Sequence, residues 1–196
     1  MQESVVKRFF IGLFFILLTA CAGQPVTQST FYTLPVIDTP TDNIRSDKTV
    51  FIRPIILADF LSKNGVVLQL DDITVHSAQY HQWAESLAAQ LSRGLRDRLQ
   101  AAQSDYRIVN LPSFAKQSSY QLQVEFDQFQ GRFDGQAVTS GQWQLLNKQG
   151  ETVTTQRFSL TQALPAEGYP VLIRALANNL DTLATDIAST LPRVDD

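Results

Sequence analysis

Residues 120–127 read YQLQVEFD and continue to Phe133 as QFQGRF, and this stretch carries the strongest β-strand pattern in the chain. The apolar residues of its first half alternate with polar ones: Tyr120, Leu122, Val124 and Phe126. A period of two predicts a strand with one buried face and one wet face. The apolar phase then shifts by one residue to Phe129 and Phe133, which predicts a β-bulge near Asp127-Gln128.

The residues that follow predict that this strand opens a three-stranded antiparallel meander. Asp134-Gly135 is a strong signal for a tight hairpin turn. A returning strand then runs to Leu146, residues 147–150 form a second turn, and residues 151–162 supply the third strand. The sequence therefore predicts one sheet whose last three strands are consecutive neighbours.

Shorter β-prone runs lie before the meander: residues 31–34, 49–57, 66–70, 73–76 and 106–109. Pro54 interrupts the second run and donates no hydrogen bond, so that strand must lie at a sheet edge or contain a bulge. Asp71-Asp72 separates the third and fourth runs, and we expect it to form a two-residue hairpin turn. These runs extend the predicted sheet beyond the meander.

Two stretches have the spacing of amphipathic helices. In residues 82–102 the apolar stripe consists of Leu87, Leu91, Leu95, Leu99 and Ala102. In residues 171–191 it consists of Leu172, Leu176, Leu180, Leu183, Ile187 and Leu191. Residues three and four apart share one helix face, so each stripe needs an apolar partner. The sequence therefore predicts an α+β fold with a single antiparallel-rich (mixed) sheet and two amphipathic helices packed on one face.

The N-terminus predicts export and lipid attachment. A basic start precedes an apolar run, residues 9–18, which is too short to span a bilayer and is typical of a signal peptide. The next residues complete Leu18-Thr19-Ala20-Cys21, which resembles the lipobox of bacterial lipoproteins. That resemblance implies cleavage between Ala20 and Cys21 and lipidation of Cys21. An ordinary signal peptide with a chance cysteine, or a small buried cysteine, is the alternative.

The same resemblance implies three acyl chains on the mature N-terminus, and two or more chains hold a protein stably in a membrane. Ala22 stands where lipoproteins kept in the inner membrane often carry aspartate, so we expect the outer membrane, with the protein facing the periplasm. We expect residues 1–20 to be the cleaved lipoprotein signal peptide, residues 21–30 a lipidated N-terminus and flexible tether, and residues 31–192 a single periplasmic α+β domain.

The net charge and the cysteine content limit which partners and which covalent crosslinks we expect. The 196-residue chain has 16 basic and 19 acidic side chains. Cleavage removes Lys7, Arg8 and Glu3, which leaves 14 basic and 18 acidic side chains and a net charge of −4. This mild acidity argues against a nucleic-acid partner. Cys21 is the only cysteine, so its acylation leaves no thiol for a disulfide.

The mature sequence offers no pattern typical of an enzyme. His76 and His81 are its only histidines, and we interpret both as surface or capping residues. The sequence has no glycine-rich phosphate loop and no Gly-x-Ser-x-Gly elbow. Asp71-Asp72 is a candidate cation site, although adjacent carboxylates in a turn are usually just solvated. We therefore predict no catalytic, cofactor-binding or metal-binding residue and no enzymatic activity.

Uncharged polar residues crowd the second face of the meander: Gln121, Gln123, Gln128, Gln130, Gln136, Gln142 and Gln144. Such a face carries few charges to desolvate, so we interpret it as a candidate partner surface; ordinary solvation of a sheet explains the pattern nearly as well. Trp83 lies at the expected edge of the first helix, where we interpret it as a staple for the preceding loop.

Several further segments form an ordered set: Phe31-Tyr32-Thr33-Leu34, Ile52-Arg53-Pro54, residues 57–61 (LADFL), residues 66–69 (VVLQ), residues 81–87 (HQWAESL), residues 126–133, Trp143-Gln144-Leu145 and Arg157-Phe158. Together with the lipobox they resemble the ABC-type transport auxiliary lipoproteins, and specifically the PqiC (YmbA-like) lipoproteins. The resemblance covers nearly the whole mature chain, and the order and spacing of the segments are more specific than any one of them. Family members often carry proline where this chain has Ser86.

The resemblance implies an outer-membrane lipoprotein that works with an MCE-domain (PqiB-like) protein. That partner is anchored in the inner membrane and forms a tube across the periplasm, in a system linked to phospholipid or other hydrophobic traffic and to envelope integrity. The lipoprotein would dock the tube at the outer membrane, and a homo-oligomeric collar around the tube is one arrangement that fits this role. Two other functions stay open: a periplasmic carrier with its own apolar lipid pocket, and a structural envelope lipoprotein without a transport role.

Overall fold

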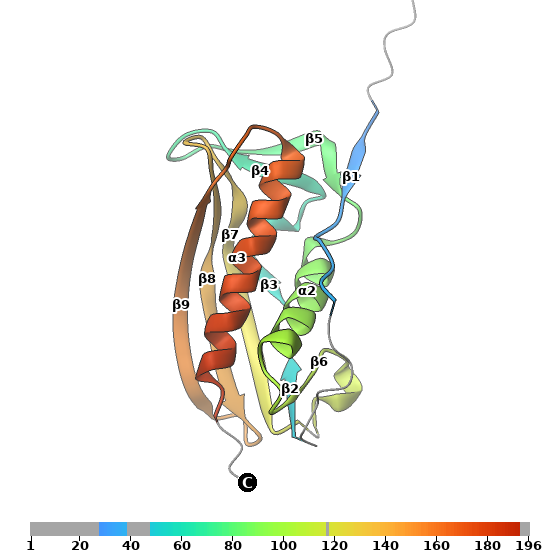
Figure 1. Cartoon of the computed structure of the whole chain (residues 1–196), viewed down its shortest axis with the longest axis vertical. Helices are drawn as coiled ribbons and strands as arrows, with labels where there is room; N and C mark the ends of the chain where they lie inside the picture. Colours follow the sequence, from blue (N-terminus) through green and yellow to red (C-terminus); the bar gives the residue numbers. More distant parts are fainter. Residues whose placement is uncertain (1–27, 39–47, 117, 193–196) are drawn as a thin grey trace, which may run out of the picture.

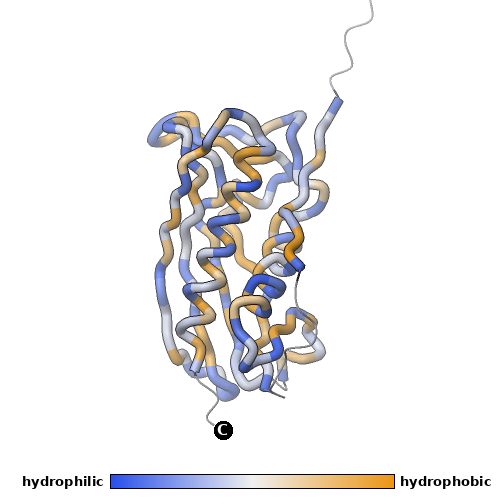
Figure 2. The backbone as a smooth tube through the Cα atoms, in the orientation of Figure 1, coloured by the Kyte–Doolittle hydropathy of each residue, from blue (hydrophilic) through white to orange (hydrophobic). Residues whose placement is uncertain are grey.

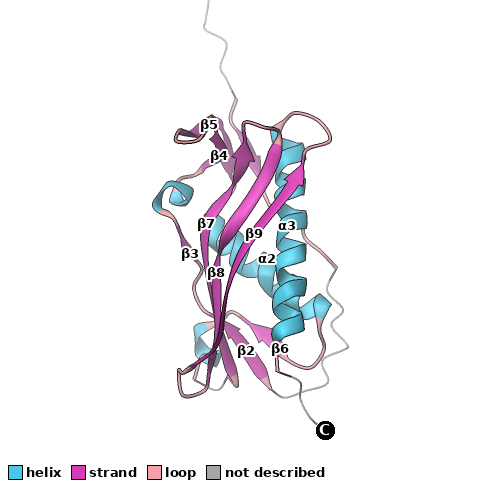
Figure 3. Cartoon of the chain, turned by 90° about the vertical axis from the view of Figure 1, so that its left-hand side faces the viewer, coloured by secondary structure: helices cyan, strands magenta, loops and turns pink. Residues whose placement is uncertain are grey.

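The computed structural model describes residues 28–38, 48–116 and 118–192, and these residues form two layers (Figures 1 and 3). Within them, one layer is a nine-stranded mixed sheet. The other layer consists of helices α2 (Leu87–Ala102) and α3 (Tyr169–Thr190), which pack against each other over one face of the sheet. The predicted α+β fold, with a single mixed sheet and both helices on one face, is confirmed.

The long strand β7 (Tyr120–Arg132) lies at the centre of the sheet. It pairs antiparallel with β8 (Gln136–Asn147), which pairs antiparallel with β9 (Thr152–Ala163), so the predicted meander is confirmed. The register between β7 and β8 shifts between Phe126 and Gln128, which is the position of the predicted bulge.

Three short strands run parallel to β7 along its other side: β2 (Thr49–Ile52), β3 (Ile56–Leu57) and β4 (Gly65–Gln69). Pro54 lies in the break between the first two of them rather than on an edge strand. Arg53 bridges the break, because its backbone N–H donates to the carbonyl oxygen of Leu122 at 2.8 Å. The structure therefore shows an interruption of the strand at Pro54, in place of the predicted edge position or bulge.

The remaining described elements are β1 (Thr30–Tyr32), β5 (Val75–Trp83), β6 (Arg107–Val109) and the short 3-10 helices η2 (Asp59–Ser62) and η3 (Pro112–Phe114). Strand β5 is antiparallel to β4, and β1 runs parallel to β5. Strand β6 runs parallel to β2 at the opposite end of the sheet. The first strand of the domain is thus linked to β7 through β5 and β4.

The core lies between the sheet and the helices, and Figure 2 shows hydrophobic and hydrophilic residues recurring along both helices. Side chains with no exposed surface come from both layers: Leu91, Leu95, Leu99, Leu122, Val124, Phe126, Leu176, Leu180, Leu183 and Ile187. The predicted stripes are correct except at their ends, where Ala102 is exposed and Leu191 is half-buried. Ala102 is the last residue of α2 and Leu191 lies just beyond α3, so neither is enclosed by a following helical turn.

The prediction that the first helix begins at residue 82 is wrong, because its first predicted residues belong to β5. Helix α2 begins at Leu87, where Ser86 Oγ accepts a hydrogen bond from the backbone N–H of Ala89 at 3.3 Å and so caps the helix. Trp83 is therefore the buried last residue of β5 rather than a residue at the helix edge. Its ring centroid lies 6.2 Å from that of Phe129, inside the core.

The connection between β4 and β5 is longer than the predicted two-residue turn. Asp71 Oδ1 accepts hydrogen bonds from the backbone N–H groups of Ile73 and Thr74, at 2.9 and 2.7 Å. The backbone N–H of Leu70 donates to the carbonyl oxygen of Thr74 at 2.8 Å. The hydrogen bonds to its carboxylate hold the pKa of Asp71 below its ordinary value. This carboxylate orders a wider turn, which is why the strand begins at Val75.

Gly141 allows close packing beside the β-bulge. It is in register with Phe126 of β7 and Phe158 of β9, whose rings meet edge to face with centroids 5.5 Å apart. A Cβ atom on Gly141 would lie 2.0 Å from the carbonyl oxygen of Glu125 and 3.0 Å from the ring of Phe158. The position therefore requires glycine.

We expect Gly141→Ala to lower the free energy of unfolding by about 1–3 kcal/mol, because the added methyl group overpacks the core. Urea denaturation of the purified domain measures the change. Ser159→Ala is the matched control, since Ser159 is exposed on the neighbouring strand and its loss should change stability by no more than about 0.5 kcal/mol. Equal stability of the two variants would contradict the packing described for Gly141.

Candidate functional site: the N-terminal strap

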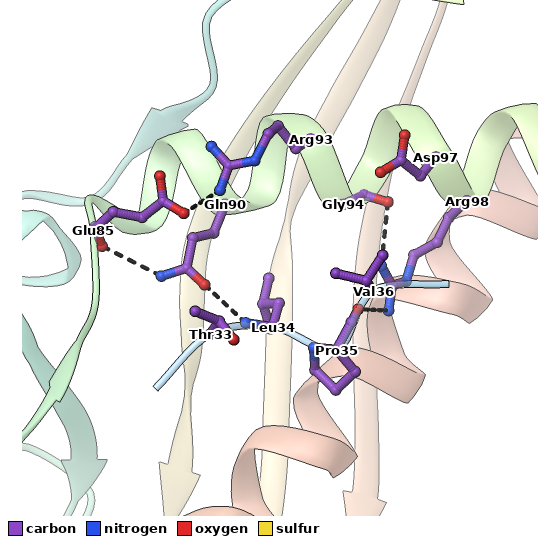
Figure 4. Close-up of a pocket in the computed structure, with 10 residues that line it drawn as sticks. All are labelled: Thr33, Leu34, Pro35, Val36, Glu85, Gln90, Arg93, Gly94, Asp97 and Arg98. Atoms are coloured by element: carbon purple, nitrogen blue, oxygen red, sulfur yellow. Dashed lines mark hydrogen bonds and ion pairs between the residues drawn. The ribbon is translucent and has the colours of Figure 1, made fainter. Parts of the chain in front are cut away.

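The candidate site is the segment that joins the N-terminus to the folded domain. After β1, residues 33–36 leave the sheet and run along α2, and we call this segment the strap (Figure 4). The backbone N–H of Ala84 donates to the carbonyl oxygen of Tyr32 at 2.9 Å, just before the strap begins. Leu34 is the buried residue of the strap and belongs to the hydrophobic core. The strap is therefore attached by packing as well as by hydrogen bonds.

Gln90 of α2 holds the backbone of the strap. Its Oε1 accepts a hydrogen bond from the backbone N–H of Leu34 at 2.8 Å, and its Nε2 donates to the carbonyl oxygen of Glu85 at 3.3 Å (Figure 4). Gln90 is only 3% exposed. A buried amide group must find such partners, because an unpaired buried donor or acceptor destabilises the fold by about 1–3 kcal/mol.

Arg98 joins the strap to both helices. Its Nη2 donates to the carbonyl oxygen of Pro35 at 3.2 Å, and its Nη1 donates to that of Gly94 at 3.3 Å (Figure 4). Its Nε donates to a carboxylate oxygen of Asp181 on α3. Arg98 is only 4% exposed, so this ion pair and the two carbonyl groups replace the hydration of its guanidinium. The planar fork of an arginine suits three directed partners in a way that a lysine does not.

A shallow pocket of about 270 Å³ lies between the strap and α2. Its walls combine the strap with polar side chains of the helix and of the segment before it, including Glu85, Arg93, Asp97 and Arg98. These ionisable groups are paired: Glu85 with Arg93, Asp97 with Arg96, and Arg98 with Asp181. The hydrogen bonds of Gln90 and Arg98 to the strap make this arrangement suited to holding the chain.

An aromatic cluster makes a second attachment for β1. The hydroxyl oxygen of Tyr32 lies 2.9 Å from His81 Nδ1, and the His81 ring stacks on Tyr169 with centroids 3.9 Å apart. Burial raises the pKa of Tyr169 above its ordinary value. From the sequence we interpret His81 as a surface or capping residue, but it lies within β5, where it links β1 to the start of α3. It is a packing residue here, whereas His76 is exposed.

The other predicted site residues have different outcomes. Ala20 and Cys21, the predicted cleavage and lipidation residues, lie outside the described residues. Asp71 and Asp72 are in the β4–β5 turn, and within the described ranges no group of three or more histidine, cysteine, aspartate or glutamate residues could hold a metal ion. No helix among the described residues is long and apolar enough to cross a membrane.

That the glutamine-rich face of the meander binds a partner remains a prediction. Gln130 is buried rather than exposed, and its Nε2 donates to Gln69 Oε1 at 3.4 Å. Other glutamines are bonded along the sheet: Ser140 Oγ donates to Gln128 Oε1 at 2.9 Å, and Gln142 Nε2 donates to Glu125 at 2.7 Å. A partner would therefore meet side chains that are already fixed in place.

Gln90 and Arg98 were missed by reading the sequence, yet a signal for them exists. Arg98 lies seven residues after Leu91, and Gln90 lies three residues after Leu87, so both fall on the apolar stripe of α2. A polar residue on such a stripe must have a buried partner. Nothing in the sequence identifies that partner as the backbone of the strap.

The chain is similar to known proteins over nearly its whole length. A sequence profile of the family described as "ABC-type transport auxiliary lipoprotein component" matches residues 32–188. The chain is similar to the intermembrane transport lipoprotein PqiC of Escherichia coli (strain K12), with 27% identity over 96% of this chain and 100% of that protein. It is similar to PqiC of Shigella flexneri to the same extent, 27% identity over 96% and 100%.

Solved structures share the fold. A crystal structure of an uncharacterized protein superposes with a TM-score of 0.73 and 26% identity, over 83% of this chain and 97% of that chain. A crystal structure of a Xanthomonas campestris protein has a TM-score of 0.66 at 13% identity, over 82% of this chain and 93% of that chain. The second likeness concerns the fold alone.

We expect Gln90→Leu to release the strap locally. Loss of the buried acceptor should raise the amide hydrogen-exchange rate of Leu34 by about fivefold or more, because a lost buried hydrogen bond is worth about 1–3 kcal/mol. Gln100→Leu is the matched control on the same helix, since Gln100 Oε1 accepts from the backbone N–H of Ile108 at 2.9 Å. It should speed exchange at Ile108 and leave Leu34 unchanged. Equal effects of both variants at both amides would contradict a local strap.

Proposed function

The chain belongs to the family of ABC-type transport auxiliary lipoprotein components, and from that premise we propose that it is the outer-membrane lipoprotein of an intermembrane lipid transport system. The observation that carries the proposal is the family match over residues 32–188, supported by relatives named intermembrane transport lipoproteins. We propose a role in transport and envelope integrity without catalysis, because these relatives are not named as enzymes.

The proposed anchor is Cys21. Cleavage after Ala20 would leave this cysteine as the first residue, with acyl chains on its sulfur and its amino group. The order of basic start, apolar run and lipobox supports this assignment, and so does the place of the only cysteine in the chain. Ala22 supports sorting to the outer membrane, with the domain facing the periplasm.

The proposed partner is an MCE-domain (PqiB-like) protein that spans the periplasm, and the lipoprotein would dock its far end at the outer membrane. Two features of the domain support a docking role. Its strap is bonded to Gln90 and Arg98 of α2, and Arg98 also pairs with Asp181 of α3, so a pull on the N-terminus is transmitted to the packed body. The domain also carries no net basic charge that would direct it to nucleic acid. A homo-oligomeric collar around the tube is compatible with this role.

A carrier that binds lipid inside its own domain is the second candidate, and the packing argues against it. Leu122, Leu95 and Leu180 meet between the sheet and the helices with no exposed surface, so the described core is filled. The pocket beside the start of α3, lined by Leu68, Leu164, Leu172 and their neighbours, has a volume of about 150 Å³. Small-molecule sites usually measure about 300–1,000 Å³. Copurified lipid bound in that pocket would favour the carrier.

We expect Cys21→Ser to abolish membrane attachment, because the serine hydroxyl offers no thiol to acylate. The variant should move from the outer-membrane fraction to a soluble fraction when cells are separated on a density gradient. Ala22→Asp is the matched variant: it should remain acylated but sediment with the inner membrane. Outer-membrane recovery of the Cys21→Ser protein would contradict the proposed anchor, and unchanged sorting of Ala22→Asp would contradict the proposed sorting signal.

We expect crosslinking in intact cells, followed by purification of the lipoprotein, to recover an MCE-domain protein with an inner-membrane anchor. The reason is that a docking subunit must contact the end of the tube. The Ala22→Asp variant serves as the control, since a domain held at the inner membrane lies away from that end. Recovery of no periplasm-spanning protein would count against docking and favour a structural envelope lipoprotein.

A further inference from the structure

We propose that the ends of two β-hairpins form an apolar tip that rests in the surface of the phospholipid bilayer to which the N-terminus is attached. The hairpins are the β4–β5 and β7–β8 connections. The inference rests on the proposed acylation of Cys21 and adds to it an orientation of the domain and a second contact with the membrane.

The tip consists of exposed apolar side chains: Leu70, Ile73, Val75 and Phe133. Ile73 is 88% exposed and Phe133 is 61% exposed, and such side chains are informative where they gather in one patch. The two hairpins are neighbours, because Gln69 of β4 is in register with Arg132 of β7. Leu70 and Phe133 directly follow this pair at the ends of the two strands, and Val75 of β5 is also in register with Gln69, so the tip is one patch rather than scattered residues.

The tip lies at the end of the domain where the chain enters. Figure 1 places both hairpins and the N-terminal end of β1 at one end of the molecule, and the turn between β8 and β9 at the other. Seven peptide units separate Cys21 from Gln28, the first described residue, and fully extended chain spans at most about 3.3–3.6 Å per residue. Gln28 therefore lies within about 25 Å of an acylated Cys21.

Strand β5 connects the tip to the entry point. It runs from Val75 at the hairpin to Trp83, where it pairs with β1. Two exposed aromatic residues lie along this path: Tyr80 on β5 is 41% exposed, and Phe31 on β1 is 61% exposed. Tyrosine rings favour the headgroup level of a bilayer, and phenylalanine is common on the apolar face of interfacial segments. The apolar tip and these rings thus occupy the end of the domain that the anchor brings to the membrane.

The charges beside the tip indicate which kind of lipid surface the tip contacts. Asp71 and Asp72 lie within the β4–β5 turn, and Asp134 pairs with Arg132 through a 2.7 Å contact in the β7–β8 turn. This acidic setting disfavours attraction to anionic lipids. The contact must therefore come from apolar insertion into a zwitterionic phospholipid surface, to the depth of about 5–10 Å that interfacial segments reach.

The test uses the full mature protein, acylated in cells and reconstituted into vesicles of phosphatidylcholine and phosphatidylethanolamine with brominated acyl chains. An environment-sensitive fluorophore is attached through Thr74→Cys, which lies next to Ile73. The matched control carries the same fluorophore through Gln149→Cys, in the exposed turn between β8 and β9. We expect bromine to quench the probe at position 74 and not the probe at position 149.

Adding Ile73→Ser and Phe133→Ser to the Thr74→Cys protein should abolish the quenching while the protein still floats with the vesicles. Flotation reports the anchor independently of the tip. If the Thr74→Cys protein without the two tip substitutions floats with an unquenched probe, the tip is overturned and the anchor is left intact. A blue-shifted probe without bromine quenching would place the tip against protein and also overturn it. A protein that fails to float would overturn the acylation and the tip together.

Discussion

Strand β7 is the constraint on which the rest of the sheet depends, because four other strands form hydrogen bonds with it. One side is occupied by β8, and the other side is shared along its length by β2, β3 and β4. The bulge after Phe126 shifts the apolar phase, so that Phe126 and Phe129 both enter the core and meet edge to face at 6.0 Å. Without that shift, every residue after the bulge would face the opposite side of the sheet.

This arrangement also determines where the N-terminus meets the domain. Strand β4 pairs with the end of β7, β5 pairs with β4, and β1 pairs with β5, so β1 is placed at the end of the sheet near the β7–β8 hairpin. The strap then crosses to α2, where Gln90 and Arg98 bind its backbone. A lipid anchor before β1 would therefore act on a defined end of a rigid body. For a docking subunit, that geometry would orient the opposite end toward the periplasm.

The fold could be predicted largely where the pattern was local. The meander and both helical stripes follow from periodicity, since the residues of each apolar face come from one continuous segment of the sequence. Strand β5 could not be predicted at its full length, because residues such as His76 and Tyr80 are exposed and its sequence lacks alternation. Its conformation depends on pairing with β4 and β1, which are distant in sequence. The parallel pairing of β2, β3 and β4 with β7 is non-local for the same reason.

The site was harder to predict than the fold. The lipobox is a local motif, so the sequence alone predicts lipidation at Cys21, and that stays a prediction. The strap has no motif, because Gln90 and Arg98 bind backbone atoms of Leu34 and Pro35, which any sequence could supply. Their position on an apolar stripe indicated buried partners without naming them. A resemblance that rests on order and spacing over the whole chain identified the family more reliably than any single residue did.

The central claim is that a covalent lipid at Cys21 attaches this packed domain to a membrane, and the mass of the N-terminal peptide tests it most directly. Tandem mass spectrometry of the protein purified from its native membranes should find a peptide that begins at Cys21 and carries three acyl chains. A peptide that begins at another residue, or a Cys21 with a free thiol, would contradict the account.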